Sequence, residues 1–158
     1  NHEGTPYLHN NTFSRGKGKF IPAAHRFSAE MPDNEYPVIL TTGRILYQYH
    51  TMTMTGKNSG LMKTAGENYM EIHPELAENL LLEQGETVKV SSRRGTIRVK
   101  TKITNKIDKN TVFIPFHFAG GANILTNNAL DRFAKEPELK ACAVKIEKLS
   151  LDTDHKQE

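Results

Sequence analysis

The sequence predicts one mainly β domain with short helices, in which six or seven strands form a closed or nearly closed mixed barrel. Three observations support this fold class. Short apolar and β-branched runs recur along the chain and are separated by turn residues. One helix lies between two of these runs, which allows a parallel strand pair, whereas a tight hairpin further on is antiparallel. The 158 residues suffice for one such domain with its own core.

The first part of the predicted barrel is a strand followed by a long loop. Residues 37–42 form a short apolar, β-branched run that stops at Gly43 and predicts a buried strand. Residues 44–70 show neither a helical nor a strand period and are rich in Thr, Gly, Tyr and Met. Loops of this length inside a compact domain are often functional, so a binding site is expected here.

A second strand and a helix follow this loop. Residues 69–72 predict the strand, and Pro74 starts the helix because proline at the first helical position needs no hydrogen-bond partner. We expect the helix to bury one leucine face and to end at Gly85, a left-handed cap. The expected inner face consists of Leu76, Leu80 and Leu81.

The next two strands are expected to form a hairpin. Residues 87–92 and 96–103 alternate between apolar and polar side chains and are joined by Arg93-Arg94-Gly95. The two arginines are expected to be solvated at the tip. In the second strand, one face is predicted to carry Ile97, Val99, Thr101 and Ile103, and the other Arg98, Lys100 and Lys102.

The remaining strands complete the predicted domain. A turn at 108–110 precedes a strand at 112–116, and the last strand is expected at 141–146, with Cys142 as a small buried residue. The barrel is expected to span 36–149. An extended lead-in from a preceding domain is predicted at 1–35, and a polar tail at 150–158, which suggests a fragment of a larger protein.

Composition and charge exclude several classes of function. The net charge of +3 comes from Lys and Arg that are spread along the chain and mixed with acids, so no nucleic-acid partner is expected. The mild excess of positive charge still favours a small polyanion such as a pyrophosphate. One cysteine and scattered histidines offer no disulfide and no metal-ligand spacing. No apolar stretch reaches membrane-spanning length, so no membrane contact is expected.

Three segments, in order, resemble one known family. Residues 41–56 (TTGRILYQYHTMTMTG), 120–126 (GGANILT) and 135–144 (KEPELKACAV) are similar to signatures of the molybdopterin-dinucleotide-binding domain in the dimethyl sulfoxide reductase superfamily. The likeness spans roughly 36–149, and the lead-in resembles the segment before this domain in formate dehydrogenase α subunits. Gln48 and Met52 depart from the commonest pattern, where relatives often carry His and Gly.

The resemblance implies a double-psi β-barrel that binds the guanine dinucleotide part of a bis(molybdopterin guanine dinucleotide) cofactor holding molybdenum or tungsten. It implies the C-terminal domain of a formate dehydrogenase, which converts formate to carbon dioxide. Catalytic residues, the metal ligand and any iron–sulfur cluster would lie in the missing N-terminal part, so the isolated domain is not expected to be catalytic. The implied partners are the other domains of the catalytic subunit and electron-transfer subunits. A cytoplasmic location is expected, and a periplasmic one would need an export signal upstream.

The candidate contacts suit such a cofactor chemically. Thr42-Gly43-Arg44 follows a strand and offers backbone N–H groups and a guanidinium for a pyrophosphate, although the same residues suit a plain loop. Asn123 has an amide that both donates and accepts, which suits a heterocycle edge or a turn. Met54 fits core packing as well as cofactor contact. The aromatic contact falls on Phe116 or, one residue on, His117. The resemblance implies as cofactor-binding residues Thr42, Gly43, Arg44, His50, Thr51, Thr53, Met54, Thr55, Phe116, Asn123 and Lys140.

The residues leave two other functions possible. The same domain occurs in nitrate reductases and other molybdenum oxidoreductases, and a stand-alone double-psi barrel would be a binding module without a catalytic body. A self-processing decarboxylase barrel of this fold would need a Gly-Ser site, and the chain offers only the reverse order at Ser59-Gly60.

Overall fold

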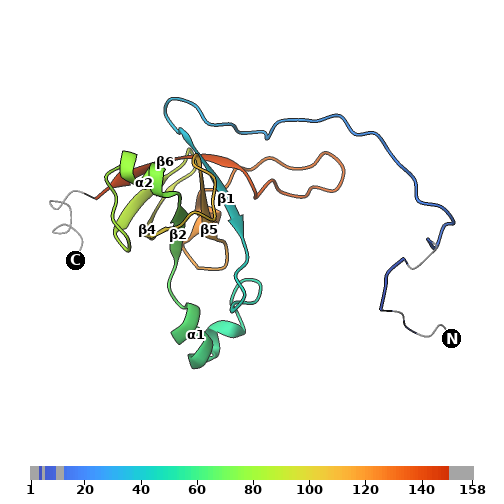
Figure 1. Ribbon diagram of the computed structural model, residues 1–158, viewed down its shortest axis with the longest axis horizontal. Coiled ribbons are helices and arrows are strands. Elements are labelled where there is room, and N and C mark those ends of the chain that lie inside the picture. Colours follow the sequence, from blue (N-terminus) through green and yellow to red (C-terminus); the bar gives the residue numbers. More distant parts are fainter. Residues whose placement is uncertain (1–3, 5, 10–12, 150–158) are drawn as a thin grey trace.

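The computed structural model describes residues 4, 6–9 and 13–149, and in it six strands close into one mixed barrel (Figure 1). The predicted tail at 150–158 lies outside the described residues. Each strand falls within two residues of its predicted position. The strands are β1 (Val38–Gly43), β2 (Tyr69–Ile72), β3 (Thr87–Ser91), β4 (Thr96–Ile103), β5 (Thr111–Pro115) and β6 (Cys142–Lys148). The α-helices are α1 (Ser59–Ala65) and α2 (Pro74–Asn79), and the 3-10 helices are η1 (Thr55–Lys57) and η2 (Ala122–Ile124).

Two halves of the chain interlock to close the barrel. Around it the strands run β1-β5-β2-β4-β3-β6. The first strand of each half (β1 or β4) pairs in parallel with the second strand of the other half (β5 or β2). The remaining pairs are antiparallel. Exchanging β1-β2-β3 with β4-β5-β6 reproduces every pair, which is the crossed topology of a double-psi barrel. The predicted fold class is therefore confirmed.

The core lies inside the barrel and follows the alternation of the strands. In β4 the inward positions Ile97, Val99 and Thr101 are buried, whereas the cationic side chain that follows each of them is exposed, as predicted. Side chains from the other strands fill the centre. The largest fully buried apolar ones include Leu40, Met70, Ile72, Val88, Val90, Val112 and Ile114. Burial of a Leu or Ile side chain contributes about 1.5–3 kcal/mol, so this interior supplies the main stabilisation.

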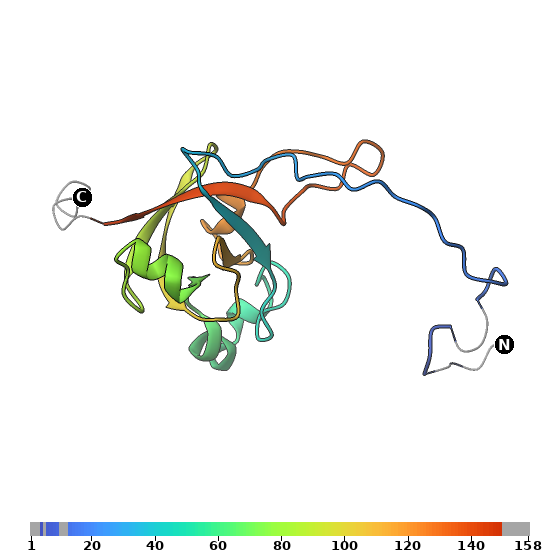
Figure 2. The ribbon, with the colours of Figure 1, turned by 45° about the horizontal axis from the view of Figure 1, so that its top comes forward.

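The connections between strands divide unevenly between the two ends of the barrel. Because β1 and β5 are parallel, they finish at the same end, which carries residues 44–68, 92–95 and 116–141 (Figure 2). We call this end the β1/β5 rim. The opposite end carries the shorter connections 73–86 and 104–110 and is called the α2 rim.

Helix α2 starts as predicted but ends earlier than expected. Leu81, not Gly85, takes the left-handed position after the helix, with φ 55°. The N–H of Leu82 donates to Ala77 O and that of Leu81 to Glu78 O, at 2.9 and 3.0 Å, which is a Schellman ending. Leu81 is consequently 77% exposed instead of facing the core, and Leu82 is buried in its place.

The loop predicted at 44–70 contains a helix that its composition did not reveal. α1 begins after Asn58, whose side chain accepts a hydrogen bond from Leu61 N–H at 3.0 Å. Asparagine is a favoured N-cap because its side-chain oxygen satisfies a free N–H of the first turn. None of the helix is fully buried, and this explains the missing apolar period.

Candidate functional site

The β1/β5 rim brings together segments that are far apart in the sequence. Gly43 ends β1 beside the end of β5, and its carbonyl accepts a hydrogen bond from Phe116 N–H at 3.2 Å. Lys140 precedes β6, and its Nζ donates to Thr42 O at 2.6 Å. The Thr42 hydroxyl donates in turn to Leu139 O at 2.7 Å. Four of the predicted site residues therefore lie around one strand end.

Positive charge is available at this strand end. Thr42 is buried and its hydroxyl is occupied, so its side chain holds the rim together. Lys140 is exposed, and only one of its three N–H donors points to Thr42 O. Arg44 is also exposed and has no ion pair or hydrogen bond with any residue in the described part of the chain. A tethered ammonium and an unpaired guanidinium suit an anionic ligand.

The loop after β1 is organised by a buried glutamine. Gln48 is only 4% exposed; its Nε2 donates to Ala65 O at 2.9 Å, and its Oε1 accepts from the Thr55 hydroxyl at 2.6 Å. His50 and Met52 in the same loop have left-handed φ angles of 49° and 65°. Such a conformation costs a non-glycine residue about 1 kcal/mol or more and tends to cluster at functional sites.

The predicted contacts of this loop differ in how free their side chains are. His50 is exposed, with its ring edge-on to Phe116 at a centroid distance of 6.4 Å. Thr51 and Thr53 are exposed and share a hydrogen bond of 3.0 Å between their hydroxyls. Met54 is 72% exposed, which excludes the core-packing alternative. Thr55 instead turns inward to Gln48, so its hydroxyl serves the loop itself.

Two polar side chains at the rim have buried atoms without hydrogen-bond partners. His117 is 4% exposed, and neither of its ring nitrogens has a partner. Asn68, just before β2, has a buried Oδ1 that also lacks a hydrogen-bond partner. Burial lowers the pKa of His117, so the ring is neutral at neutral pH and offers one donor and one acceptor. Buried polar groups without partners are uncommon in folded proteins, and a ligand is one way to satisfy them.

A glycine lets the loop after β5 close over Asn68. A Cβ added to Gly121 would lie 2.9 Å from Phe118 O and 3.0 Å from Asn68 Nδ2, so no side chain fits there. η2 follows directly and presents Asn123, which is exposed. The predicted amide contact thus lies on the same rim as Asn68, a residue that sequence reasoning missed.

Two other features of this rim differ from what the sequence predicted. His117 appeared only as an alternative register for Phe116, although a histidine between two phenylalanines after an apolar strand is a usable signal. Arg93 and Arg94 were expected to be solvated. Arg93 is exposed, although it pairs with Asp33, but for Arg94 the prediction is wrong. Arg94 is half-buried, is paired with Glu30 and donates to Leu125 O at 2.7 Å. Glu30 lies in the lead-in, too far away in the sequence to be recognised as its partner.

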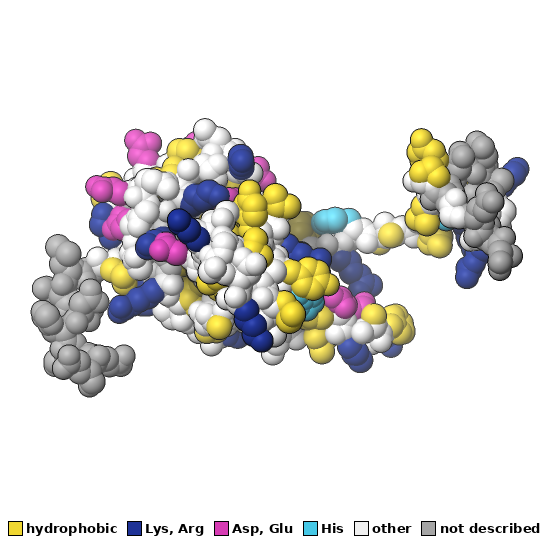
Figure 3. All heavy atoms as spheres, turned by 90° about the horizontal axis from the view of Figure 1, so that it is seen from below, with side chains coloured by type: hydrophobic (Ala, Val, Ile, Leu, Met, Phe, Trp, Pro, Cys, Tyr) yellow, Lys and Arg dark blue, Asp and Glu magenta, His cyan; other side chains and the backbone are white. Residues whose placement is uncertain are grey.

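Apolar side chains are exposed around the rim. Figure 3 views the molecule from the side on which α1 lies in Figure 1, and hydrophobic side chains are visible there beside Lys and Arg. Exposed apolar groups gathered on one face usually mark an interaction site. Those on the rim loops include Leu46, Tyr47, Tyr49, Met54 and Ile124.

Other chemistries find less support in the described residues. Among residues 4, 6–9 and 13–149, no group of three or more His, Cys, Asp or Glu side chains is placed to hold a metal ion. Cys142 is buried as predicted, and desolvation raises the pKa of its thiol to about 11. No helix in the described ranges combines the length and apolarity needed to cross a membrane.

Fold and rim together define a class: a double-psi barrel with one polar, incompletely paired rim suited to an anionic ligand that carries a heterocycle. Comparison with known proteins then identifies the family. The family described as "Molydopterin dinucleotide binding domain" matches residues 38–143, and the chain belongs to it. The resemblance drawn from the three sequence segments is therefore confirmed.

Similar proteins are much longer than this chain. The F420-dependent formate dehydrogenase subunit alpha of Methanocaldococcus jannaschii is 51% identical over 152 residues, which are 94% of this chain and 23% of that protein. The nitrate reductase of Symbiobacterium thermophilum is 44% identical over 138 residues, or 84% of this chain and 18% of that protein. Acetylene hydratase from Pelobacter acetylenicus has the same fold, with a TM-score of 0.65 and 19% identity over 73% of this chain and 19% of its own.

Proposed function

We propose that the β1/β5 rim binds the guanine dinucleotide part of a bis(molybdopterin guanine dinucleotide) cofactor, as one wall of the site in a larger formate dehydrogenase. The observation that carries this proposal is the meeting of the three family segments at one barrel rim. The same rim contains the partnerless polar atoms of His117 and Asn68. The rim therefore has groups that a polar heterocycle can satisfy and cations that a pyrophosphate can neutralise.

The described side chains fit the chemical parts of this group. Arg44 and Lys140 provide positive charge for the pyrophosphate, and Lys140 keeps two free donors. Asn123 offers an exposed amide for a base edge. His117 and the Oδ1 of Asn68 are buried acceptors or donors for a flat polar ring. Thr51 and Thr53 add exposed hydroxyls, and His50 and Phe116 a pair of rings, beside these groups.

The residues of this chain indicate which tasks belong to this domain and which belong to the cofactor and the other domains. When bound, the cofactor supplies the redox chemistry through its molybdenum or tungsten ion. This domain binds and orients the dinucleotide and excludes water from it, with its exposed apolar side chains covered by the remaining domains of the catalytic subunit. Those domains would hold the metal ligand and any iron–sulfur cluster. Electron-transfer subunits and a cytoplasmic location complete the proposal, and the sequence upstream of this chain tests the location.

Formate is preferred over nitrate as the substrate of the whole enzyme. The formate dehydrogenase subunits of Methanocaldococcus jannaschii and Methanococcus maripaludis are 46–51% identical to this chain, whereas the nitrate reductases are 38–44% identical. The lead-in also resembles formate dehydrogenases. Nitrate reductase stays as the second candidate because its relatives match most of the chain as well.

Nucleotide titration tests the binding site. GDP should shift the NMR signals of Arg44, Asn123 and Lys140 in the 158-residue chain, and Lys140→Gln should weaken binding about tenfold, since a hydrogen bond to a charged group contributes about 1.5–3 kcal/mol. Lys106→Gln, an exposed lysine on the α2 rim, is the matched control with the same change in charge. Shifts confined to the α2 rim, or equal weakening by both variants, would contradict the assignment. The chain alone should show no formate oxidation.

A further inference from the structure

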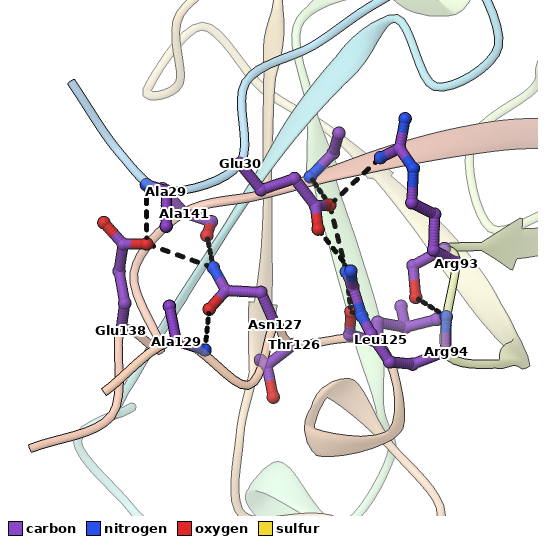
Figure 4. A network of polar contacts seen from close by, with 12 residues as sticks. Ala29, Glu30, Arg93, Arg94, Leu125, Thr126, Asn127, Ala129, Glu138 and Ala141 are labelled. Carbon is purple, nitrogen blue, oxygen red and sulfur yellow. Dashed lines mark hydrogen bonds and ion pairs between the residues drawn. The ribbon is translucent and has the colours of Figure 1, made fainter. Parts of the chain in front are cut away.

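Glu30, a residue of the lead-in, is bound tightly to the barrel. Its side chain is only 13% exposed, and its carboxylate accepts hydrogen bonds from both terminal nitrogens of Arg94 (Figure 4). It also accepts the N–H of Ala143 at 2.7 Å, at the start of β6. Arg93 approaches the same carboxylate at 3.5 Å and pairs with Asp33. Upstream, the lead-in extends away from the barrel (Figures 1 and 2).

Arg94 connects Glu30 to the loop that carries Asn123. Its Nε and Nη2 donate to Leu125 O at 3.2 and 2.7 Å. Leu125 is fully buried and caps the C-terminal end of η2, two positions after Asn123. Glu30, Arg94 and Leu125 therefore form a continuous chain of hydrogen bonds from the lead-in to the loop that carries Asn123.

A second connection leads to the segment of Lys140. The N–H of Ala29 donates to Glu138 Oε2 at 3.0 Å. Asn127 donates to the same carboxylate oxygen at 3.2 Å and to Ala141 O at 2.7 Å, and its own Oδ1 accepts Ala129 N–H at 2.9 Å (Figure 4). The lead-in thus contacts one end of the segment between η2 and β6 at Glu138 and is connected to the other end through Arg94.

The loop around η2 depends on these side chains because it has few backbone bonds of its own. Between Phe118 and Leu125 the backbone makes only single-turn hydrogen bonds, such as Leu125 N–H to Ala122 O at 2.9 Å, and no strand pairing. Burial alone would raise the pKa of Glu30. The hydrogen bonds from Arg94 and Ala143 and the charges of both arginines lower it below its ordinary value, so the carboxylate is ionised at neutral pH.

We infer that the lead-in contributes to the cofactor-binding site. Glu30 is a positioning residue that acts through Arg94 to hold the Asn123 loop in its binding conformation. This inference rests on the proposed function, since Asn123 matters only if the rim binds a heterocycle. Arg94 is the middle residue of this hydrogen-bonded connection and is not a solvated turn residue.

The first test uses the chain without nucleotide. Glu30→Gln keeps the side-chain shape and removes the charge, and it should shift the amide NMR signals and speed the hydrogen exchange of residues 121–126 while β2 and β4 stay unchanged. Asp33→Asn is the matched control, because it removes the other partner of Arg93 and leaves the Glu30–Arg94 pair. Unchanged signals at 121–126, or equal changes in all strands, would overturn the inference. If Glu30→Gln does not fold, Arg94→Lys replaces it, since a lysine keeps the charge but lacks the fork that reaches both Glu30 and Leu125.

The second test separates this inference from the proposed function. With GDP as the probe, Glu30→Gln should weaken binding about tenfold, the lower end of the range seen when a residue that orients a metal ligand is removed, and Asp33→Asn should leave it unchanged. If the unaltered chain binds no GDP, the proposed function fails in this form, and the exchange data at 121–126 alone decide the positioning role. If the chain binds GDP and Glu30→Gln binds it equally well, the positioning role is wrong while the site stands.

Discussion

The two rims of this barrel differ in how completely their polar groups are paired. On the α2 rim the Thr101 hydroxyl donates to Glu83 O, Gln84 accepts the N–H of Ile103 at 2.7 Å, and Lys148 pairs with Glu86 at 3.2 Å. On the β1/β5 rim, His117 and Asn68 have buried atoms without partners. Of the left-handed non-glycine residues, His50 and Met52 lie in the loop of this rim that follows β1, whereas Leu81 lies on the α2 rim.

This difference assigns separate tasks to the two ends of one fold. Paired polar groups and short connections lower the energy of the folded chain. Unpaired buried groups and left-handed residues raise it, and they persist because the rest of the barrel is stable enough to hold them. A ligand that satisfies such groups gains the interaction without having to rearrange the protein first. The β1/β5 rim therefore depends on the rest of the barrel, chiefly its buried core, for its stability.

The largest expected effect comes from the core below the α2 rim. Ile72 is fully buried at the end of β2, and Ile72→Ala should lower the free energy of unfolding by about 3 kcal/mol in urea titration. GDP affinity of the folded fraction should stay unchanged. Ile114→Ala is the matched variant, since Ile114 is equally buried and pairs with Thr42 next to the proposed site. It should cost about as much stability and also weaken GDP binding. Equal effects of both variants on binding would remove the distinction between the rims.

A smaller effect concerns pH and the buried histidine. Burial lowers the pKa of His117 in the folded chain below its usual 6.5, so the unfolded chain binds more protons once the pH falls below that value. The free energy of unfolding should therefore be level above pH 6.5 and decrease as the pH falls from there toward the folded-state pKa. Urea titrations across this window measure the slope. His117→Gln, which cannot take up a proton, should lose it, and a slope that survives the substitution would assign the effect to another group.

Local patterns explain which parts of the fold were predictable. The strand at 96–103 was predictable because its apolar and polar residues alternate, and this alternation shows which face of the strand each side chain occupies. Helix α1 has no buried face, so its sequence lacks the helical period of apolar residues that would have predicted it. The ending of α2 was misplaced because glycine is the usual left-handed residue, and here a leucine takes that position four residues before Gly85.

The candidate site was predictable as segments but not as an arrangement. The residue types of Thr42-Gly43-Arg44 and Asn123 suggested ligand chemistry, and the family resemblance singled them out. The contact between Thr42 and Lys140 joins residues 98 positions apart, and that between Glu30 and Arg94 joins residues 64 apart. No local pattern encodes such pairs. Asn68 became a candidate only from its buried, unpartnered Oδ1, and the same observation raised His117 above a mere alternative to Phe116.

The smallest expected effect is a gain in stability on the α2 rim. Leu81 holds a left-handed φ of 55° with a side chain that is 77% exposed, so it has the strain of that conformation and little burial to offset it. Glycine adopts this conformation freely, although it loses more backbone entropy on folding, and Leu81→Gly should stabilise the chain by roughly 0.5–1 kcal/mol. Thermal and urea unfolding measure the gain. The same change at His50, which is also left-handed but lies on the β1/β5 rim, should relieve similar strain and weaken GDP binding, because there the strained side chain is a proposed contact. If His50→Gly bound GDP as well as Leu81→Gly does, the left-handed backbone of the β1/β5 rim would have no part in binding.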